Sequence, residues 1–274
     1  MTAAARPSKA ADTASGAATR APWRWAVAGA VLGALLALLL AAPARWLGAL
    51  LSHASGGAVQ LLDAEGSVWR GSARLEFTGG AGSRDRAALP GRLHWRLTPG
   101  PGALHASVQA QCCTPHGAIA LAITPRWGGA HIAVREGHSE WPAALLTGLG
   151  TPFNTLQLHG TLLLLTQPLS LDIAQGRVRV EGSASLTAQR ISSRLSPLPA
   201  LGSYRVQLAG GAAPSLRLQT LEGALHLSGS GQWSGGRLRF AGEASAAEGM
   251  EAPLANLLNV IGQRRGNKAL INFS

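Results

Sequence analysis

The sequence predicts a mainly β protein: a curved antiparallel sheet of many short strands with one or two short helices, preceded by one N-terminal transmembrane helix. A charge-free apolar run of twenty residues lies near the N-terminus, apolar and polar residues alternate with period two from residue 58 onward, and Gly or Pro separates the alternating runs. Hydrophobic residues make up 46% of the chain, and 35 glycines punctuate them. This apolar content excludes wholesale disorder.

The N-terminal segments predict the compartment. Residues 1–24 are rich in Ala, Ser and Thr, carry an excess of positive charge and show no apolar periodicity, so we expect a disordered cytoplasmic tail. Residues 25–47 are predicted to form a transmembrane signal-anchor helix, because the run from Trp25 to Ala44 contains no charge. A helix of that length spans about 30 Å, the thickness of one hydrocarbon core. The positive-inside rule then places residues 48–274 in the periplasm as a β-rich domain, which indicates a single-pass protein of a bacterial inner membrane.

A cleaved signal peptide is the alternative to an anchor. Ala42-Pro43-Ala44 resembles an A-x-A cleavage site. The apolar run is, however, longer than the usual h-region of about 7–15 residues, and Pro43 lies inside the cleavage tripeptide. We therefore favour an anchor that is not cleaved.

Period-two alternation predicts the strands of the exported part. In a strand, successive side chains face opposite sides, so each run gives one apolar and one solvated face. The runs are Ala73–Phe77, Leu93–Leu97, Leu104–Ala110, Ile119–Ile123, His131–Val134, Leu156–Leu164, Val178–Leu186, Leu216–Leu218, Leu225–Leu227 and Leu238–Phe240.

Two segments have helical character instead. Ser139–Leu149 has Pro142 in its first turn, which suits a short helix. Pro253–Arg265 carries apolar residues at helical spacing and ends in arginines, with Gly266 placed to cap it. Ala269–Phe273 is expected to return as a final strand.

A weak internal similarity links three segments that share a Gly, an alternating strand, and then Gly with small residues. They are Gly66–Leu75, Gly176–Leu186 and Gly223–Gly231. Their spacing is not constant, which excludes a regular solenoid. The glycines are expected to mark bulges or turns of a curved sheet, and two pseudo-duplicated halves, about 58–150 and 151–274, are an open alternative.

Composition and motif searches argue against catalysis. The net charge is +11, but only Lys9 and Lys268 among the 24 basic residues are lysine, which we attribute to compositional bias rather than nucleic-acid binding. The sequence contains no Walker A, G-x-S-x-G, G-x-G-x-x-G or H-E-x-x-H motif. We therefore expect no catalytic residue, cofactor, metal site or small-molecule substrate.

The eight histidines are expected to be surface or structural residues. His94 falls on the polar face of a predicted strand. His131 and His138 have only Glu136 and Glu140 at metal-ligand spacing, which is a weak signal.

Cys112 and Cys113 are the only cysteines. Adjacent Cα atoms are about 3.8 Å apart, below the usual disulfide range of about 4.4–6.8 Å, so a vicinal disulfide needs a strained turn. Thr114-Pro115 makes such a turn plausible, and an oxidising compartment would favour the bond. Two reduced thiols or an intermolecular disulfide remain alternatives, and no catalytic role is assigned to either cysteine.

Four segments, in this order along the chain, resemble the type II secretion system protein N (general secretion pathway protein N) family. They are Ala64–Ala73 with Gly66, Trp69 and Gly71; Ser196–Tyr204 with Leu201, Gly202 and Tyr204; Leu221–Ala244 with Gly223, Gly229 and Gly242; and the amphipathic Leu254–Gly262. The resemblance covers most of the chain after residue 25, and these residues are expected to form family-like structural motifs.

The resemblance implies a non-enzymatic accessory subunit of the type II secretion machinery. Its expected partners are the inner-membrane platform subunits, with the outer-membrane channel as a further candidate. Two alternatives stay open: a periplasmic lipid-binding or lipid-transfer module anchored in the inner membrane, and a secreted hydrolase. An open apolar trough on the sheet would favour the lipid-binding alternative.

Overall fold

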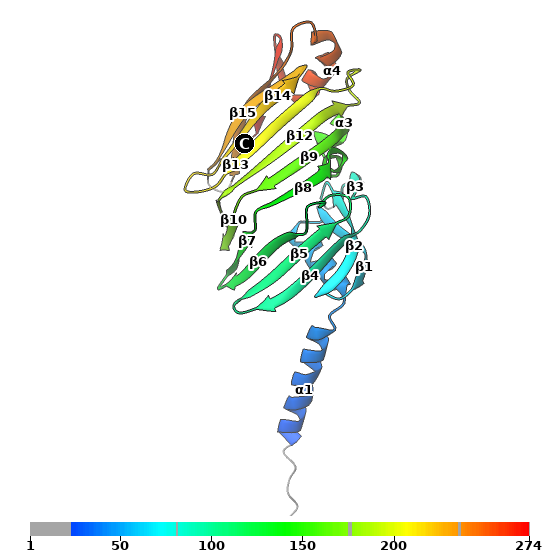
Figure 1. Cartoon of the computed structure of the whole chain (residues 1–274), viewed down its shortest axis with the longest axis vertical. Helices are drawn as coiled ribbons and strands as arrows, with labels where there is room; N and C mark the ends of the chain where they lie inside the picture. Colours follow the sequence, from blue (N-terminus) through cyan, green and yellow to red (C-terminus); the bar gives the residue numbers. More distant parts are fainter. Residues whose placement is uncertain (1–22, 81, 175–176, 235–236, 274) are drawn as a thin grey trace, which may run out of the picture. The chain divides into compact units, whose positions relative to one another are not determined.

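The structure is a computed structural model that describes residues 23–80, 82–174, 177–234 and 237–273 (Figure 1). The chain divides into two units, residues 1–41 and 42–274. In the first unit, α1 (Trp23–Leu40) is exposed along its whole length, and its length and composition suit a membrane span. The predicted tail, residues 1–24, lies outside the described residues except for Trp23 and Arg24, which begin α1.

The apolar helix is shorter than the predicted 25–47. It ends at Leu40, and a second helix that the sequence did not predict, α2 (Ala44–Ala54), begins after Pro43 in the second unit. Pro43 lacks an N–H and is extended, with φ −71° and ψ 146°, so a continuous helix is broken there. Helix α2 lies against β1 (Val59–Gly66), where a Cβ on Gly48 would lie 3.4 Å from the Leu61 side chain.

The mainly antiparallel β fold is confirmed, with two nine-stranded sheets in the described ranges where the sequence predicted one. Besides β1, the first sheet contains β2 (Arg70–Thr78), β3 (Arg86–Ala88), β4 (Leu93–Gly100), β5 (Ala103–Ala110), β6 (Ile119–Arg126), β7 (Gly129–Val134), β10 (Leu169–Ala174) and β11 (Arg177–Glu181). The second contains β8 (Gly137–Pro142), β9 (Leu158–Thr166), β12 (Ser183–Ser193), β13 (Gly202–Ala209), β14 (Ser215–Gly223), β15 (Leu225–Ser234), β16 (Arg237–Ala246), β17 (Gln263–Arg265) and β18 (Lys268–Phe273).

Three very short connections carry the chain between the two sheets, from β7 to β8, from β9 to β10 and from β11 to β12. The last of them is Gly182 alone, with φ +93°, and a Cβ there would lie 2.0 Å from the Pro168 carbonyl oxygen. The predicted run Val178–Leu186 is therefore two strands in different sheets. At these connections the chain leaves one sheet and enters the other. The division into halves 58–150 and 151–274 stays a prediction.

Each sheet has its own buried core. In the second sheet, α4 (Glu251–Ile261) packs on β16 and β18, and Leu254, Leu257 and Leu258 are 0–1% exposed. In the first sheet, the core gathers around Trp95 of β4, with Ala44 of α2 among its members. The Leu93–Leu97 alternation is confirmed, because Leu93 and Trp95 are buried while His94 and Arg96 are exposed.

Two predicted helices have different bounds. Ser139–Pro142 belongs to β8, and only Ala143–Leu149 is helical, as the 3₁₀ helix η1; a further short helix, α3, spans Phe153–Leu156. Ser139–Pro142 pair with β9 in an antiparallel register, which makes them a strand, and η1 begins directly after Pro142.

The predicted helix Pro253–Arg265 is α4, which ends earlier, at Ile261. The backbone of Gly262 is extended, and no larger residue fits there, because a Cβ on Gly262 would lie 2.3 Å from the Leu270 carbonyl oxygen. Arg264 and Arg265 form β17, and Gly266, with φ +64°, turns the chain into β18 rather than capping the helix. The final strand is confirmed.

Candidate functional site at the junction of the two sheets

The first group of family-like residues forms a tight turn between β1 and β2. Gly66 pairs with Gly71, and a Cβ on Gly71 would lie 2.5 Å from the Trp95 ring. The indole Nε1 of Trp95 donates a hydrogen bond to the Val68 carbonyl oxygen at 3.0 Å. The carbonyl oxygen of Trp69 accepts a hydrogen bond from the Leu97 amide at 2.7 Å. These residues hold β4 against the β1–β2 turn.

The second group lies where β13 meets β14. Gly202 and Gly223 face each other, and a Cβ on Gly223 would lie 2.2 Å from the Gly202 Cα. Tyr204 is buried and donates its hydroxyl to the Leu225 carbonyl oxygen at 3.1 Å. Burial raises the pKa of Tyr204, so the phenol stays neutral and remains a donor. Leu201 is 2% exposed beside them.

Gly229 and Gly242 form a third close pair, between β15 and β16. A Cβ on Gly229 would lie 2.4 Å from the Phe240 ring, and a Cβ on Gly242 would lie 2.9 Å from it. The ring therefore occupies the space that side chains at these two positions would fill. In all three groups the structure gives the family-like residues packing roles.

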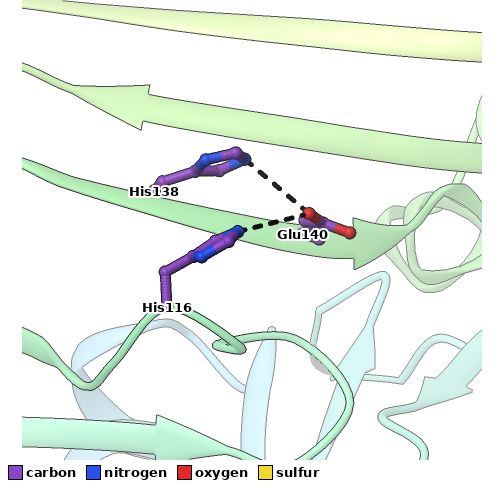
Figure 2. A group of neighbouring side chains, drawn as sticks. All are labelled: His116, His138 and Glu140. Carbon is purple, nitrogen blue, oxygen red and sulfur yellow. Dashed lines mark ion pairs between the residues drawn. The ribbon is translucent and has the colours of Figure 1, made fainter.

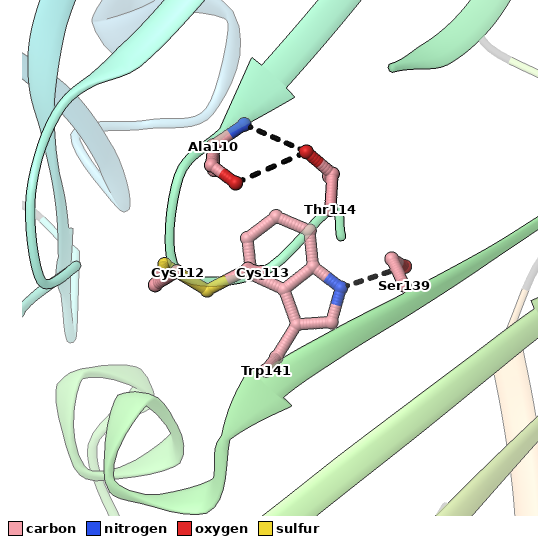
Figure 3. Close-up of a disulfide and its surroundings, with 6 residues drawn as sticks. All are labelled: Ala110, Cys112, Cys113, Thr114, Ser139 and Trp141. Atoms are coloured by element: carbon pink, nitrogen blue, oxygen red, sulfur yellow. Dashed lines mark hydrogen bonds between the residues drawn. A yellow bond between two sulfur atoms is a disulfide. The ribbon is translucent and has the colours of Figure 1, made fainter. Parts of the chain in front are cut away.

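The cysteine pair lies in the turn after β5, next to the second sheet (Figure 3). A disulfide joins Cys112 and Cys113, whose Cα atoms are 3.7 Å apart. The Thr114 hydroxyl accepts a hydrogen bond from the Ala110 amide at 3.1 Å and donates one to the Ala110 carbonyl at 3.0 Å, which closes the turn. The amide of Glu140 in β8 donates to the Cys113 carbonyl oxygen at 2.8 Å. The turn is thus tied to both sheets.

Trp141 lies over this turn and packs against the cores of both sheets. Its indole Nε1 donates to the Ser139 hydroxyl at 2.8 Å (Figure 3). Cys113 is fully buried in the first core and Trp141 contacts both cores, so the disulfide and the indole lie where the two sheets meet. This Trp belongs to a segment predicted as a helix, so its junction role was not visible in the sequence.

The disulfide gives a direct chemical prediction. Protein prepared under non-reducing conditions is expected to take up no iodoacetamide on Cys112 or Cys113, even when unfolded, because both thiols are already bonded. Reduction before alkylation should label both residues. The measurement is peptide mass spectrometry of the two samples. Labelling without prior reduction would indicate free thiols, and a dimer on non-reducing gels would indicate an intermolecular bond.

Beyond the turn, three ligand-type side chains come together (Figure 2). The Nε2 atoms of His116 and His138 lie 3.9 Å and 3.8 Å from the same Glu140 carboxylate oxygen. The two imidazole rings stack, with centroids 4.8 Å apart and an interplanar angle of 29°. His138 and Glu140 are alternate residues of β8 and share its polar face, so their spacing was a signal; nothing in the sequence brought His116 to them.

A separate polar cluster lies on the first sheet. His131 Nδ1 and Asp172 Oδ1 are 2.9 Å apart, and Arg126 lies 3.4 Å from the same oxygen. The hydrogen bond from His131 lowers the pKa of Asp172, desolvation raises it by less, and the charges of His131, Arg126 and Arg179 each lower it by a smaller amount. We assign this group a structural role, because its partners satisfy one another.

The apolar faces of the sheets are only partly covered. Register places the apolar residues of β5, β6, β7, β10 and β11 on one face of the first sheet, without a break. Most of them are half-buried, and Ile173 and Val178 are exposed; in the second sheet Leu186, Val206 and Leu218 are also half-buried. The members on the first sheet are Leu104, Ala106, Val108, Ile119, Leu121, Ile123, Ile132, Val134, Leu169, Leu171, Ile173, Val178 and Val180. These strands form an open apolar surface.

Fold and site together define a class of protein: a β-rich unit of two joined sheets, preceded by an apolar helix, whose motif residues serve packing. A comparison with protein families matches residues 57–271 to the family type II secretion system (T2SS), protein N, so the chain belongs to this family. No curated protein and no solved structure shows a significant match. Membership implies involvement in type II secretion and interaction with other components of that machinery.

Proposed function

We propose that this chain is a non-enzymatic accessory subunit of the type II secretion machinery, anchored in the inner membrane with its β-rich unit in the periplasm. In this role it supports the export of folded exoproteins across the outer membrane. The family match over residues 57–271 is the observation that carries the proposal. The apolar helix α1 supports the anchor, and the packing roles of the motif residues support a scaffold rather than an enzyme.

Strand edges offer the proposed scaffold a means of contact. Strand β11 ends the first sheet and exposes Val178 to 59%, and Arg179 follows it. On this outer edge the Gly211 amide already donates to the Val180 carbonyl oxygen at 2.8 Å, so we propose β-augmentation only for the part of β11 before Val180. Platform subunits, and the outer-membrane channel as a second candidate, are the proposed partners.

An uncleaved anchor is supported by the contacts of the A-x-A-like segment. Ala42 and Ala44 are 5% and 1% exposed, and the Ala42 carbonyl oxygen accepts a hydrogen bond from the Val68 amide at 2.8 Å. Pro43 forms an isolated β-bridge with Ser67. These residues are part of the folded β-rich unit, so cleavage after Ala44 would remove contacts that the unit uses.

We therefore predict that the mature protein keeps residues 1–44. Mass spectrometry of protein purified from membranes and digested with trypsin should recover the peptide from Trp25 to Arg45, which crosses the Ala44–Arg45 bond. The protein should also stay in the membrane pellet after alkaline extraction. A chain that starts at Arg45, or release of the protein by alkali, would contradict the anchor.

The functional test is deletion of the gene followed by complementation. In the deletion strain, exoproteins of the type II pathway are expected to accumulate in the periplasm, and the full-length chain should restore them to the medium. A matched variant carries the same β-rich unit behind a cleavable signal peptide, and it should restore less secretion because it is no longer held at the membrane. Normal secretion by the deletion strain would refute the proposed function.

The open apolar surface favours a second candidate function, the binding of lipid. A half-buried face built from Leu, Ile and Val on adjacent strands could contact acyl chains, which need no polar partner. Lipid extraction and mass spectrometry of the purified protein would test this function. Lipid bound in a fixed ratio, together with normal secretion in the deletion strain, would favour it over the accessory-subunit proposal.

A further inference from the structure

We propose that His116, His138 and Glu140 form a binding site for a divalent transition-metal ion of the zinc class. Their ligand atoms all lie within 4.8 Å of one another. Imidazole nitrogen and carboxylate oxygen are ordinary ligands of Zn²⁺, and two histidines with one glutamate make a three-ligand set that leaves a further position open. The proposal is independent of the secretion role.

The distances suit a shared ion better than direct hydrogen bonds. The two Nε2 atoms lie 3.9 Å and 3.8 Å from one Glu140 oxygen, beyond the about 2.7–3.2 Å of an N–H···O hydrogen bond. Neighbouring ligand atoms around a tetrahedral Zn²⁺ are about 3.4 Å apart, given Zn–N and Zn–O bonds of about 2.1 Å. The two His–Glu separations are within about half an ångström of this value, and the widest separation in the group, at most 4.8 Å, would have to close by up to about 1.4 Å.

The environment of His138 is the second observation. Its Nε2 atom is buried and has no hydrogen-bond partner among the described residues. Buried polar atoms are almost always hydrogen-bonded, so an unpartnered one calls for an explanation such as an ion. Both imidazoles present Nε2 toward Glu140 (Figure 2), the arrangement that an ion between the three side chains requires.

The position of the site gives the ion a structural consequence. His116 comes from the connection between β5 and β6 in the first sheet, whereas His138 and Glu140 belong to β8 in the second. The His116 and Glu140 side chains are 60% and 40% exposed, so an ion can enter from solvent. A bound ion would tie the two sheets together beside the Cys112–Cys113 turn, and it should stabilise the folded state by mass action.

Zinc titration of the full-length protein in detergent tests the proposal. The protein carries no polyhistidine tag, is stripped with EDTA and is alkylated without reduction, and a chromogenic chelator competes for the metal at about pH 7.5, where neutral imidazole binds metals. We expect one Zn²⁺ per chain. His116→Gln, His138→Gln and Glu140→Gln should each weaken binding at least about 10-fold, the lower end of the effect of losing even an outer-shell partner.

The matched control is His94→Gln, which changes an exposed histidine on β4. This variant should bind zinc like the unchanged chain, and zinc should raise the unfolding temperature of both, reversibly with EDTA. His116→Gln decides the test if the other variants fold poorly, because the His116 side chain is the most exposed of the three. The proposal is overturned if the unchanged chain binds no zinc, if His116→Gln binds as tightly as His94→Gln, or if binding depends on free thiols.

Discussion

Replacing Leu257 with Asp is expected to unfold the β-rich unit or to destabilise it by more than about 4 kcal/mol, because the new carboxylate would have to be buried without a partner. Leu257 is 1% exposed in the contact between α4 and the second sheet. Truncating a buried Leu alone costs about 2–5 kcal/mol, and the charge adds to that. Since the free energy of unfolding of a domain is about 5–15 kcal/mol, this loss is a large fraction of the stability of the β-rich unit. Urea unfolding followed by tryptophan fluorescence measures it.

The same helix provides the control. Val260 is 39% exposed, so Val260→Asp should change the free energy of unfolding by no more than about 0.5 kcal/mol. If both variants unfold at the same urea concentration, α4 is not packed on the second sheet as described.

Gly223→Ala is expected to have the second large effect. Gly223 has φ +123°, and the added Cβ would lie 2.2 Å from the Gly202 Cα and 2.4 Å from the Leu201 carbonyl oxygen. Because these are backbone atoms, β13 and β14 would have to move apart, and the buried Tyr204 hydrogen bond lies in the same region. We expect a loss of at least about 3 kcal/mol from backbone strain and overpacking together.

Gly211→Ala separates these two causes. Gly211 has a similar φ of +114°, but no other atom lies within 4 Å of its added Cβ. This variant should lose only the conformational cost, about 1–2 kcal/mol. Urea unfolding of both variants gives the comparison, and equal losses would show that the close approach of Gly202 and Gly223 is not a constraint.

Local patterns predicted most of the strands, but they did not predict where one sheet ends and the other begins. The alternation around Trp95 and Leu93 is a property of neighbouring residues, so the sequence alone was enough to assign that strand. At Gly182 the alternation continues from β11 into β12, and only the pairing of β11 with β10 and of β12 with β9 and β13 shows that two sheets meet there. The predicted anchor, residues 25–47, extended past the break at Pro43 and so included the first four residues of α2.

The candidate site shows the same limit. His138 and Glu140 lie two residues apart on one strand, so sequence spacing indicates that they share a face. His116 joins them only because the turn after β5 packs against β8, a tertiary contact with no local signal. The predicted resemblance to a known family was confirmed by the match over residues 57–271. It could be recognised from the sequence because it depends on the order of motifs along the chain rather than on contacts between them.

The central claim, that this chain works as a subunit of the type II secretion machinery, is tested most directly by affinity purification of the full-length protein from detergent-solubilised membranes at native expression, with quantitative mass spectrometry. The account predicts that the full-length chain recovers more of the inner-membrane platform subunits than a control protein does. The control is the β-rich unit without residues 1–41, exported behind a cleavable signal peptide. Recovery of the chain with lipid but without any secretion subunit would contradict it.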